Sequence, residues 1–562
     1  MGLAATAIAN GDDSENGALT DENDTLYSRA AIESARVKIE AVPGSGKIRG
    51  VWLFNNKKYA FRDNAAGTNC IMWESSSTGW QEIDLGAYTD FSAGTDSADI
   101  GFVVGEEVRG GSSSSTGTIV AVVKTGGSWV AGTATGRVYV RSVSGVPFPV
   151  EVFTGQTSGT YATSSGKQPI TLLPGGRYEF VNENFYGHSS LKAMFGCDGV
   201  NNGFMFSANG FQLIVTGMVD DAPIHVAEHK KHLFFAFPGG SVQHSSIGNP
   251  AEWSPITGAA EIATGDEITA FVTLPGDTLG VMNRNRLYIL YGTSAANWNL
   301  IEHSDESGAI EWTVQRIGKP VYFDDRGLMD FKAVQDYGDF KNASFSEKIS
   351  KTLRANKNNV LSSIRIRDKN QYRLFFDNNT FVVCSFEDRK LSGFTICEYP
   401  IPVECTASVE DSDGNEVLLF GCDNGYVYQM DKGTSFDGAA VDAFVRLAFN
   451  FMGSAERNKK FFKAVFEVTA GEASQISFTP DFDYGETEDV SQDIDVTASG
   501  GVWDVSNWDS FIWGDQLISN PIAYIDGSGQ NIGITLFSST TYEQPHTLNS
   551  VIIHYSNKGV KR

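Results

Sequence analysis

Cysteine and long apolar runs are scarce in this chain of 562 residues. No stretch approaches the roughly 18 consecutive apolar residues of a membrane-spanning helix. The N-terminus lacks a basic segment ahead of an apolar one, so we expect neither a signal peptide nor a membrane span. Most of the six cysteines lie in apolar, strand-like runs and none forms a Cys-x-x-Cys pair, which predicts reduced core thiols. They are Cys70, Cys197, Cys384, Cys397, Cys405 and Cys422.

Positive charge is also scarce. The chain has 43 lysines and arginines against 68 acidic residues, a formal net charge of -25, and no block of five basic residues. Such a surface repels nucleic-acid phosphates rather than binding them. The sequence leaves two explanations open: an acidic balance that keeps an abundant protein soluble, or a negative lumen along which DNA slides without adhering.

Helical periodicity is nearly absent. Only residues 26–40 and 328–354 could hold a helix, and neither segment has a sustained 3.6-residue apolar period. Aromatic residues make up 12% of the chain and there are 59 glycines, which is typical of many short strands joined by tight turns. The composition therefore predicts an all-β protein.

Short strand-turn-strand units recur along the chain. Residues 48–63 alternate apolar and polar positions around an Asn-Asn turn, which predicts a β-hairpin, and residues 70–85 add a second pair of strands. The tetrapeptide FGCD occurs at 195–198 and again at 420–423. The intervening 225 residues would hold about five four-stranded units of ~40–50 residues each. We therefore predict a β-propeller of roughly six blades.

The other segments differ in composition and in apolar pattern. Residues 10–25 are acidic without a core pattern, and residues 88–166 are rich in glycine, serine, threonine and valine. Long alternating strands of sandwich type appear at 460–479 and 532–556. The predicted organisation is an N-terminal arm (1–40), a β-propeller (41–87 and 167–440), a small inserted β-domain (88–166) and a C-terminal, platform-like β-sandwich domain (441–562).

A histidine group has spacing that resembles a metal site. Of His225, His229 and His232, the first two would share one face of a helix, but the residues after the third, LFFAF, predict a strand. No glutamate directly follows the first histidine, as H-E-x-x-H requires. We interpret these histidines as a solvated strand end and expect no metal ligands there.

An acidic turn resembles a calcium loop only in part. Asp411, Asp413 and Asn415 match its first three ligands, but Gly414 comes two positions early and Cys422 replaces the twelfth-position glutamate. We interpret this segment as a hairpin turn. No G-x-S-x-G motif and no sialidase-type S-x-D-x-G-x-T-W turn occurs, so we expect no catalytic residues and no cofactor.

Three tryptophans lie at five-residue intervals near the C-terminus. Trp503, Trp508 and Trp513 stand in a short polar segment. Large rings with one wet edge are favoured at contacts between domains or subunits. We interpret these tryptophans as a candidate interface, with carbohydrate stacking as the alternative.

Several segments resemble the tail nozzle, or tail-hub, proteins of short-tailed bacteriophages. The resemblance covers most of 170–562 and, more weakly, 40–87. Its motifs lie in turns and strand ends, at residues 172–206, 234–255, 265–292, 318–331 and 503–513 and in the terminal IIHYSNKGVKR. The inserted segment resembles small β-modules found in various phage proteins.

This resemblance implies a structural protein rather than an enzyme. Six subunits would form a ring below the portal and the head-to-tail adaptor, an acidic conduit for genome retention and ejection. The other partners would be tail fibres or spikes, and phage DNA that passes without sequence-specific binding. The protein would belong to the virion tail and assemble in the host cytoplasm. One alternative is a receptor-binding or fibre-anchoring tail module; another is a propeller glycosidase, which needs only two facing carboxylates.

Overall fold

The structure, a computed structural model, shows an all-β protein made of two compact units. One unit extends from Glu40 to Met430, and the other combines the preceding N-terminal segment with the residues from Asp431 onward. The residues that the structure describes are 30–144, 149–187, 192–331, 344–387, 390–470, 474–485, 491–496, 517–541 and 546–560.

Helices are short throughout the described residues. Residues 30–36 are helical, and α4 covers Ser350–Asn356 after a 3₁₀ turn at Glu347–Ile349. Each segment in which a helix was expected therefore contains a short helix among its described residues. A second 3₁₀ turn covers Pro255–Thr257. Within the described part of the chain, no helix has the length and apolarity needed to cross a membrane.

Seven small antiparallel sheets make up most of the Glu40–Met430 unit. The first sheet contains β1 (Ser45–Phe54), β2 (Lys57–Asp63), β3 (Cys70–Ser76) and β4 (Gly79–Glu82). The second contains β12 (Glu179–Glu183), β13 (Ala193–Cys197), β14 (Phe204–Ser207) and β15 (Gly210–Leu213). The third contains β16 (His225–His229), β17 (His232–Phe237), β18 (Ser241–His244) and β19 (Ala260–Ala263).

The other four sheets follow in chain order. The fourth contains β20 (Ile268–Leu274), β21 (Thr278–Asn283), β22 (Leu287–Tyr291) and β23 (Asn299–Ser304). The fifth contains β24 (Gln315–Ile317), β25 (Lys319–Asp324) and β26 (Gly327–Asp330). The sixth contains β27 (Val360–Ile366), β28 (Gln371–Phe376), β29 (Thr380–Glu387) and β30 (Lys390–Glu398). The seventh contains β31 (Val403–Glu410), β32 (Glu416–Cys422) and β33 (Val427–Gln429).

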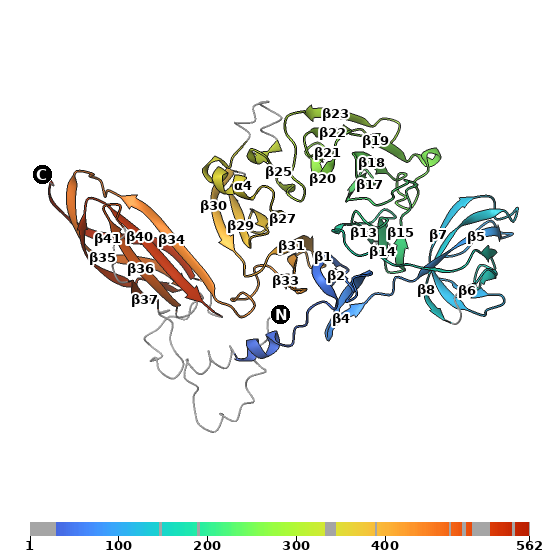
Figure 1. Ribbon diagram of the computed structural model, residues 1–562, viewed down its shortest axis with the longest axis horizontal. Coiled ribbons are helices and arrows are strands. Elements are labelled where there is room, and N and C mark those ends of the chain that lie inside the picture. The colour runs from blue at the N-terminus through green and yellow to red at the C-terminus, as the bar shows by residue number, and fades with distance from the viewer. Residues whose placement is uncertain are drawn as a thin grey trace, which may run out of the picture. The chain divides into compact units, whose positions relative to one another are not determined.

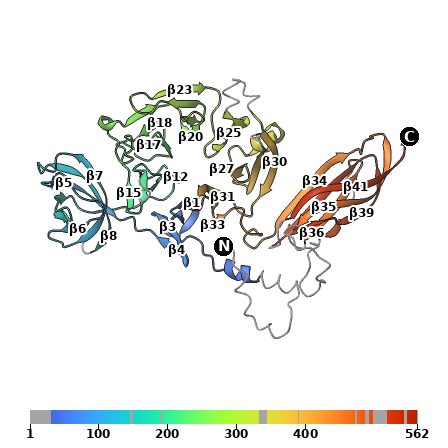
Figure 2. The ribbon, with the colours of Figure 1, turned by 180° about the vertical axis from the view of Figure 1, so that it is seen from behind.

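These sheets are the blades of a closed β-propeller. The first strand of each sheet contacts the first strand of the next, and β1 contacts β31, so the ring closes (Figure 1). The view from behind shows the same succession (Figure 2). The described ring has seven blades where the sequence predicted roughly six. The two FGCD copies lie at the ends of β13 and β32, which are the second strands of two blades five blades apart. The first blade precedes both copies.

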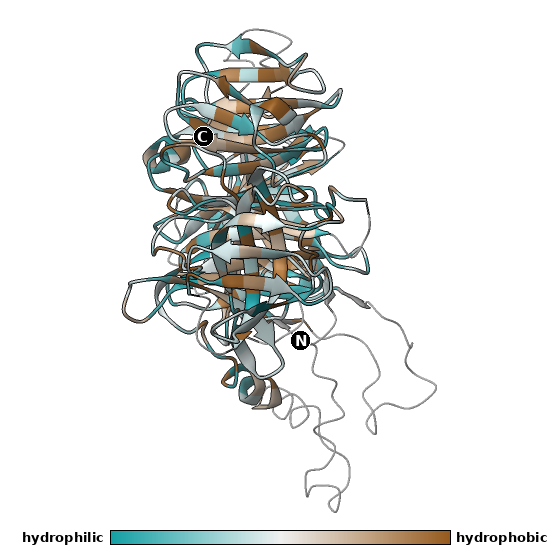
Figure 3. Ribbon diagram, turned by 90° about the vertical axis from the view of Figure 1, so that its right-hand side faces the viewer, coloured by the Kyte–Doolittle hydropathy of each residue, from teal (hydrophilic) through white to brown (hydrophobic). Residues whose placement is uncertain are grey.

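The second strand of each blade is largely buried, because neighbouring blades cover both of its faces. Strand β17 has the sequence HLFFAF and every residue in it is buried. Residues in β21, β25 and β28 are buried after the first position. Figure 3 shows hydrophobic strand segments interspersed with more hydrophilic ones. The expected hairpin turn at Asn55 and Asn56 is confirmed, and both residues have the positive φ of a tight primed turn (48° and 60°).

The seam between the first and seventh blades is held by side chains and by one main-chain bond. The Val42 amide donates to the Gly425 carbonyl over 2.9 Å. Lys47 pairs with Glu404 at 2.7 Å, and the Ser412 amide donates to Asn56 Oδ1 over 2.8 Å. No strand is exchanged between these two blades among the described residues.

The inserted segment forms a small closed barrel. Its strands are β5 (Ala87–Thr95), β6 (Glu107–Gly110), β7 (Thr116–Gly126), β8 (Ala134–Ser144), β9 (Val152–Gly155), β10 (Tyr161–Ser164) and β11 (Gln168–Pro169). The order β10-β9-β6-β7-β8-β5 closes because β10 also pairs with β5. Phe91, Phe102, Trp129 and Phe153 pack in its own core.

The barrel is nevertheless joined to the propeller by shared packing. Val120, Ala121 and Tyr139 are buried in the cluster that holds Phe54 and Phe206 of the first two blades. The Tyr139 hydroxyl donates to the Leu213 carbonyl over 3.0 Å. The inserted barrel therefore shares part of its core with the first two blades.

The C-terminal unit contains a β-sandwich. One sheet has the order β34 (Val441–Asn450), β40 (Ile532–Thr540), β36 (Ser474–Phe482) and β37 (Gln492–Val496). In the other, β35 (Arg457–Ala470) pairs with β38 (Leu517–Ser519), β39 (Ile522–Gly529) and β41 (His546–Val560). Phe461, Phe466, Phe478, Ile525 and Ile534 are among the residues that pack together as its core.

Candidate functional site

A cluster of charged and aromatic side chains lies where the first strands of the blades surround the propeller axis. Arg177 precedes β12 and Glu179 begins it, His225 begins β16, and Glu311 and Trp312 precede β24. These residues belong to the second, third and fifth blades. The propeller fold therefore brings together residues that are far apart in the sequence.

Arg177 makes contacts across the axis. Its guanidinium donates to the carbonyl of Leu361 in the sixth blade, 184 positions along the chain. It also lies over the Trp312 ring, 3.9 Å from the ring centroid, in cation–π geometry. Burial lowers the pKa of Arg177 to about 10, although nearby carboxylates, including Glu311 and Glu179, act in the opposite direction.

His225 lies between two carboxylates. Its Nδ1 is 2.8 Å from Glu179 Oε2, and its Nε2 is 3.7 Å from Glu311 Oε1. Burial alone would lower the pKa of His225, but the charge and hydrogen bond of Glu179 and the charge of Glu311 outweigh it, so the pKa is raised. Burial raises the pKa of Glu311 against the charges of His225 and Arg177.

This axial cluster is suited to closing the propeller bore. One guanidinium, one imidazole, two carboxylates and an indole interact there, so the positive charges face negative ones. Perturbed titrating groups beside a cavity can also mark a catalytic site. The adjoining cavity has a volume of about 270 Å³, and its lining includes Arg284, Glu311, Trp312 and Lys357. The two basic side chains of this lining, Arg284 and Lys357, already pair with Asp325 at 2.7 and 3.4 Å.

The pKa shifts predict a pH dependence of propeller stability. Because the folded pKa of His225 is raised above its ordinary value of 6.5, its stabilising contribution is complete below that pH and is lost as pH rises through the folded pKa. The raised pKa of Glu311 acts in the same direction. Urea unfolding of the full chain should therefore show falling stability above pH 6.5. The His225→Gln variant should show a flatter profile; an unchanged profile would contradict the assignment.

The other two histidines of the metal-like group lie away from the axial cluster. His229 and His232 face each other across the β16–β17 hairpin, which confirms a strand rather than a helix. The expectation of a solvated strand end was wrong, because His225, His229 and His232 are 1%, 3% and 1% exposed. Stacked blades cover both faces of this hairpin. Among the described residues, no group of three His, Cys, Asp or Glu side chains is placed to hold a metal.

His229, His232 and His244 lie in one layer of aromatic rings with Phe234 and Trp298. His232 and His244 both have Nδ1 near the Ser245 carbonyl, at 2.6 and 2.9 Å. The Trp298 indole donates to His244 Nε2 over 3.0 Å. Burial lowers the pKa of His244 to about 4 and also lowers that of His229. The layer therefore contains a neutral His244 at neutral pH.

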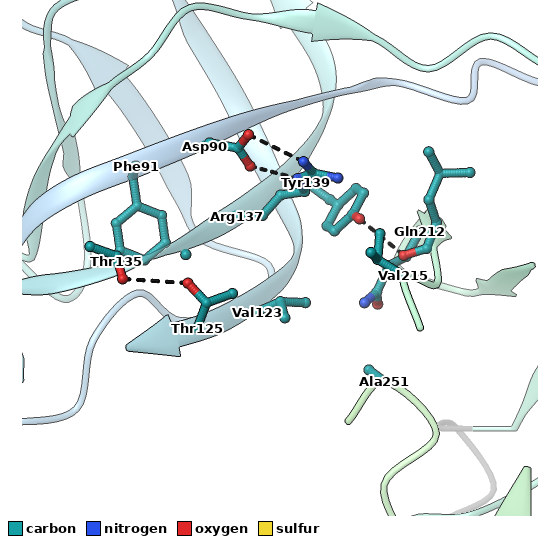
Figure 4. A pocket seen from close by; sticks show the side chains of 12 residues that line it. Asp90, Phe91, Val123, Thr125, Thr135, Arg137, Tyr139, Gln212, Val215 and Ala251 are labelled. Carbon is teal, nitrogen blue, oxygen red and sulfur yellow. Dashed lines mark hydrogen bonds and ion pairs between the residues drawn. The ribbon is translucent and has the colours of Figure 1, made fainter. Parts of the chain in front are cut away.

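A cleft of about 340 Å³ lies between the inserted barrel and the propeller (Figure 4). On the barrel side, Arg137 forms two bonds to Asp90, at 2.6 and 3.1 Å. On the propeller side, the Gln212 side chain lines the cleft, is 2% exposed and makes no hydrogen bond within the described protein. Val123, Val215 and Ala251 add apolar wall. The cleft could accept a ligand group that bonds to the Gln212 amide.

The remaining sequence candidates have simpler outcomes. Asp411, Asp413 and Asn415 lie in the β31–β32 turn, where Asp411 Oδ1 accepts from the amides of the other two at 2.9 and 2.8 Å. The hairpin interpretation is confirmed. The tryptophans at 503, 508 and 513 lie outside the described residues.

Comparisons with known proteins show no family. No protein-family model matches the chain, and a search of curated proteins finds no similar sequence. The computationally designed Ika8 protein matches 70% of this chain over 98% of its own, at 10% identity and a TM-score of 0.32. The WD40 β-propeller domain of Doa1 matches 45% of this chain over 93% of its own, at 7% identity and a TM-score of 0.28. Scores this low carry no functional argument, and the propeller assignment rests on the sheet topology.

Proposed function

We propose that the chain is a structural subunit of the tail nozzle, or tail hub, of a short-tailed bacteriophage. In this proposal it acts in the virion tail as one of about six copies in a ring below the portal and adaptor. The ring forms an acidic conduit for genome retention and ejection, and tail fibres or spikes attach to it. The subunit has no catalytic role and no cofactor.

The filled propeller axis is the observation that carries this proposal furthest. The Arg177 contact with Leu361 joins blades on different sides of the ring, and the Trp312 ring packs against the same guanidinium. A bore closed by side chains leaves no path for a duplex, so a conduit built from this chain has to run between subunits. This geometry supports a ring of propellers rather than a single propeller threaded by DNA.

The location of the resemblance also supports a framework role. Residues 172–206, 234–255, 265–292 and 318–331 fall in the second to fifth blades and their turns. Of these segments, only 172–206 reaches the axial cluster, through Arg177 and Glu179. A resemblance spread over several blades favours a shared scaffold, since a shared active site would concentrate it at one place.

Reconstitution with the adaptor and portal tests the proposal. Electron microscopy of the purified chain mixed with that complex should show a closed ring added to it. A DNA-retention series across salt should show no duplex binding near physiological ionic strength, because each chain carries a net charge of -25. Failure to join the complex, or tight and salt-sensitive binding of duplex DNA, would reject the proposal.

The cleft beside the inserted barrel favours one second candidate, a receptor-binding or fibre-anchoring tail module. The unpaired Gln212 amide beside Arg137 and Asp90 is the kind of polar group that orients a bound ligand. Binding of host-surface glycans or purified fibre protein to the chain, lost in the Gln212→Ala variant, would support this candidate over the nozzle. Unchanged binding in Gln212→Ala would remove it.

A further inference from the structure

Strand β34 forms one edge of a sheet in the C-terminal sandwich. Among the described residues it pairs only with β40, and eight of its ten residues are exposed. An edge strand presents a row of main-chain donors and acceptors to any other strand, and natural proteins usually protect such edges with charge or proline. The sequence of β34, VDAFVRLAFN, has one acidic residue, one basic residue and no proline.

Each face of this edge carries an exposed apolar side chain. Phe444 is 77% exposed and lies opposite Phe537, which is 42% exposed. On the other face Val445 is 48% exposed, although it lies opposite Leu536 of the sandwich core. The apolar layers of the sheet therefore continue to its edge, where a further strand would bury them.

We propose that β34 pairs antiparallel with β34 of a second copy of this chain, with Phe444 on the two-fold axis. Asp442 precedes Phe444 by two residues and Arg446 follows it by two. In this register each Asp442 faces Arg446 of the second copy, and Phe444 faces Phe444. Cross-strand pairs of opposite charge and of aromatic rings both stabilise antiparallel sheets.

Charge complementarity determines this register and favours a second copy of the chain as the pairing partner. Shifting the two-fold axis by one residue in either direction places Asp442 opposite Phe444 or Ala448, so both ion pairs are lost. Arg446 already bonds to Asp481 at 3.3 Å, but 49% of its side chain is exposed, and a guanidinium has five donors for a second carboxylate. A two-fold contact also uses both edges at once and ends further strand addition.

This inference goes beyond the proposed function and does not depend on it. The contact is isologous and joins two free chains, whereas a closed ring of about six needs heterologous contacts. Pairing through β34 would leave the purified chain as a dimer until another partner displaced it.

Cysteine cross-linking of the full chain tests the register. Phe444→Cys places the new thiol directly opposite itself, so mild oxidation should give a disulfide-linked dimer. Leu447→Cys, on the same strand, would face Val441 and should not cross-link; the unmodified chain controls for the native cysteines. Equal cross-linking of both variants, or none in Phe444→Cys, would overturn the proposal.

Sedimentation equilibrium tests the ion pairs. The unmodified chain should form a dimer at micromolar concentration. Asp442→Lys should raise its dissociation constant by about tenfold or more, because two opposite-charge pairs become like-charge pairs. Circular dichroism of both proteins controls for folding. If the chain forms a hexamer and Phe444→Cys does not cross-link, the proposed ring is supported and this inference is overturned. A dimer whose dissociation constant is unchanged in Asp442→Lys would also overturn it.

Discussion

Deleting residues 88–166 and closing the gap with a short Gly/Ser linker should give an aggregating or severely destabilised propeller. The deletion removes Val120, Ala121 and Tyr139 from the cluster they share with the first two blades, which uncovers the rings of Phe54 and Phe206. Loop closure itself would cost little, so the loss is one of packing. Soluble yield and thermal unfolding of the deletion variant measure it; a soluble variant with an unchanged transition would contradict the shared core.

Two point substitutions separate shared packing from packing inside the barrel. Tyr139 is 1% exposed in the shared cluster, so Tyr139→Ala should destabilise the propeller by about 3–5 kcal/mol. Phe153 is 0% exposed in the barrel's own core, and Phe153→Ala should affect the barrel while sparing the propeller. Tyr139→Phe, which removes the hydroxyl that donates to Leu213 and keeps the ring, should cost about 1 kcal/mol. Amide hydrogen exchange measures the stability of the barrel and of the propeller separately.

Replacing Lys459 by methionine should destabilise the C-terminal sandwich by about 3 kcal/mol. This lysine is 0% exposed, and its ammonium donates to the carbonyls of Ser454, Arg457 (2.9 Å) and Gln530 (2.8 Å). Burial lowers its pKa, partly opposed by the charge of Asp483. Methionine fills a similar volume but leaves these three partly buried carbonyls without the ammonium donor.

Lys463 provides the matched control on the same strand. It lies in β35 opposite Tyr524 and is only partly buried. Lys463→Met removes the same charge without removing a main-chain partner, so its effect on chemical unfolding should be small. Equal losses of unfolding free energy in the two variants would show that the effect comes from the charge and not from the hydrogen bonds to the carbonyls.

Local patterns in the sequence predicted local structure well. The Asn55-Asn56 turn, the strands that flank it and the Asp411 turn depend on neighbours a few residues apart, and each is present. The FGCD copies gave the correct interval of five blades but not the blade that precedes them.

Features that depend on distant packing were not predicted. The burial of His229 depends on stacked blades, and Arg177 reaches Leu361 only because the ring closes. Arg177 stands two residues before Glu179, at the point where a first strand begins, and Glu311 precedes another first strand. Aligning the predicted blades at these positions would have placed the charged residues together on the axis.

The seam of the propeller has a mechanical consequence. The chain enters the ring beside Val42 and leaves it after Met430, and the Val42–Gly425 bond places the two ends at the same junction. Pulling the flanking segments apart therefore loads the first and seventh blades directly, while the other interfaces carry little force. Without an exchanged strand, that load falls on the apolar packing between the two blades and on bonds such as Lys47–Glu404 and Asn56–Ser412. Under tension the ring should open at the seam between the first and seventh blades while the individual blades stay folded.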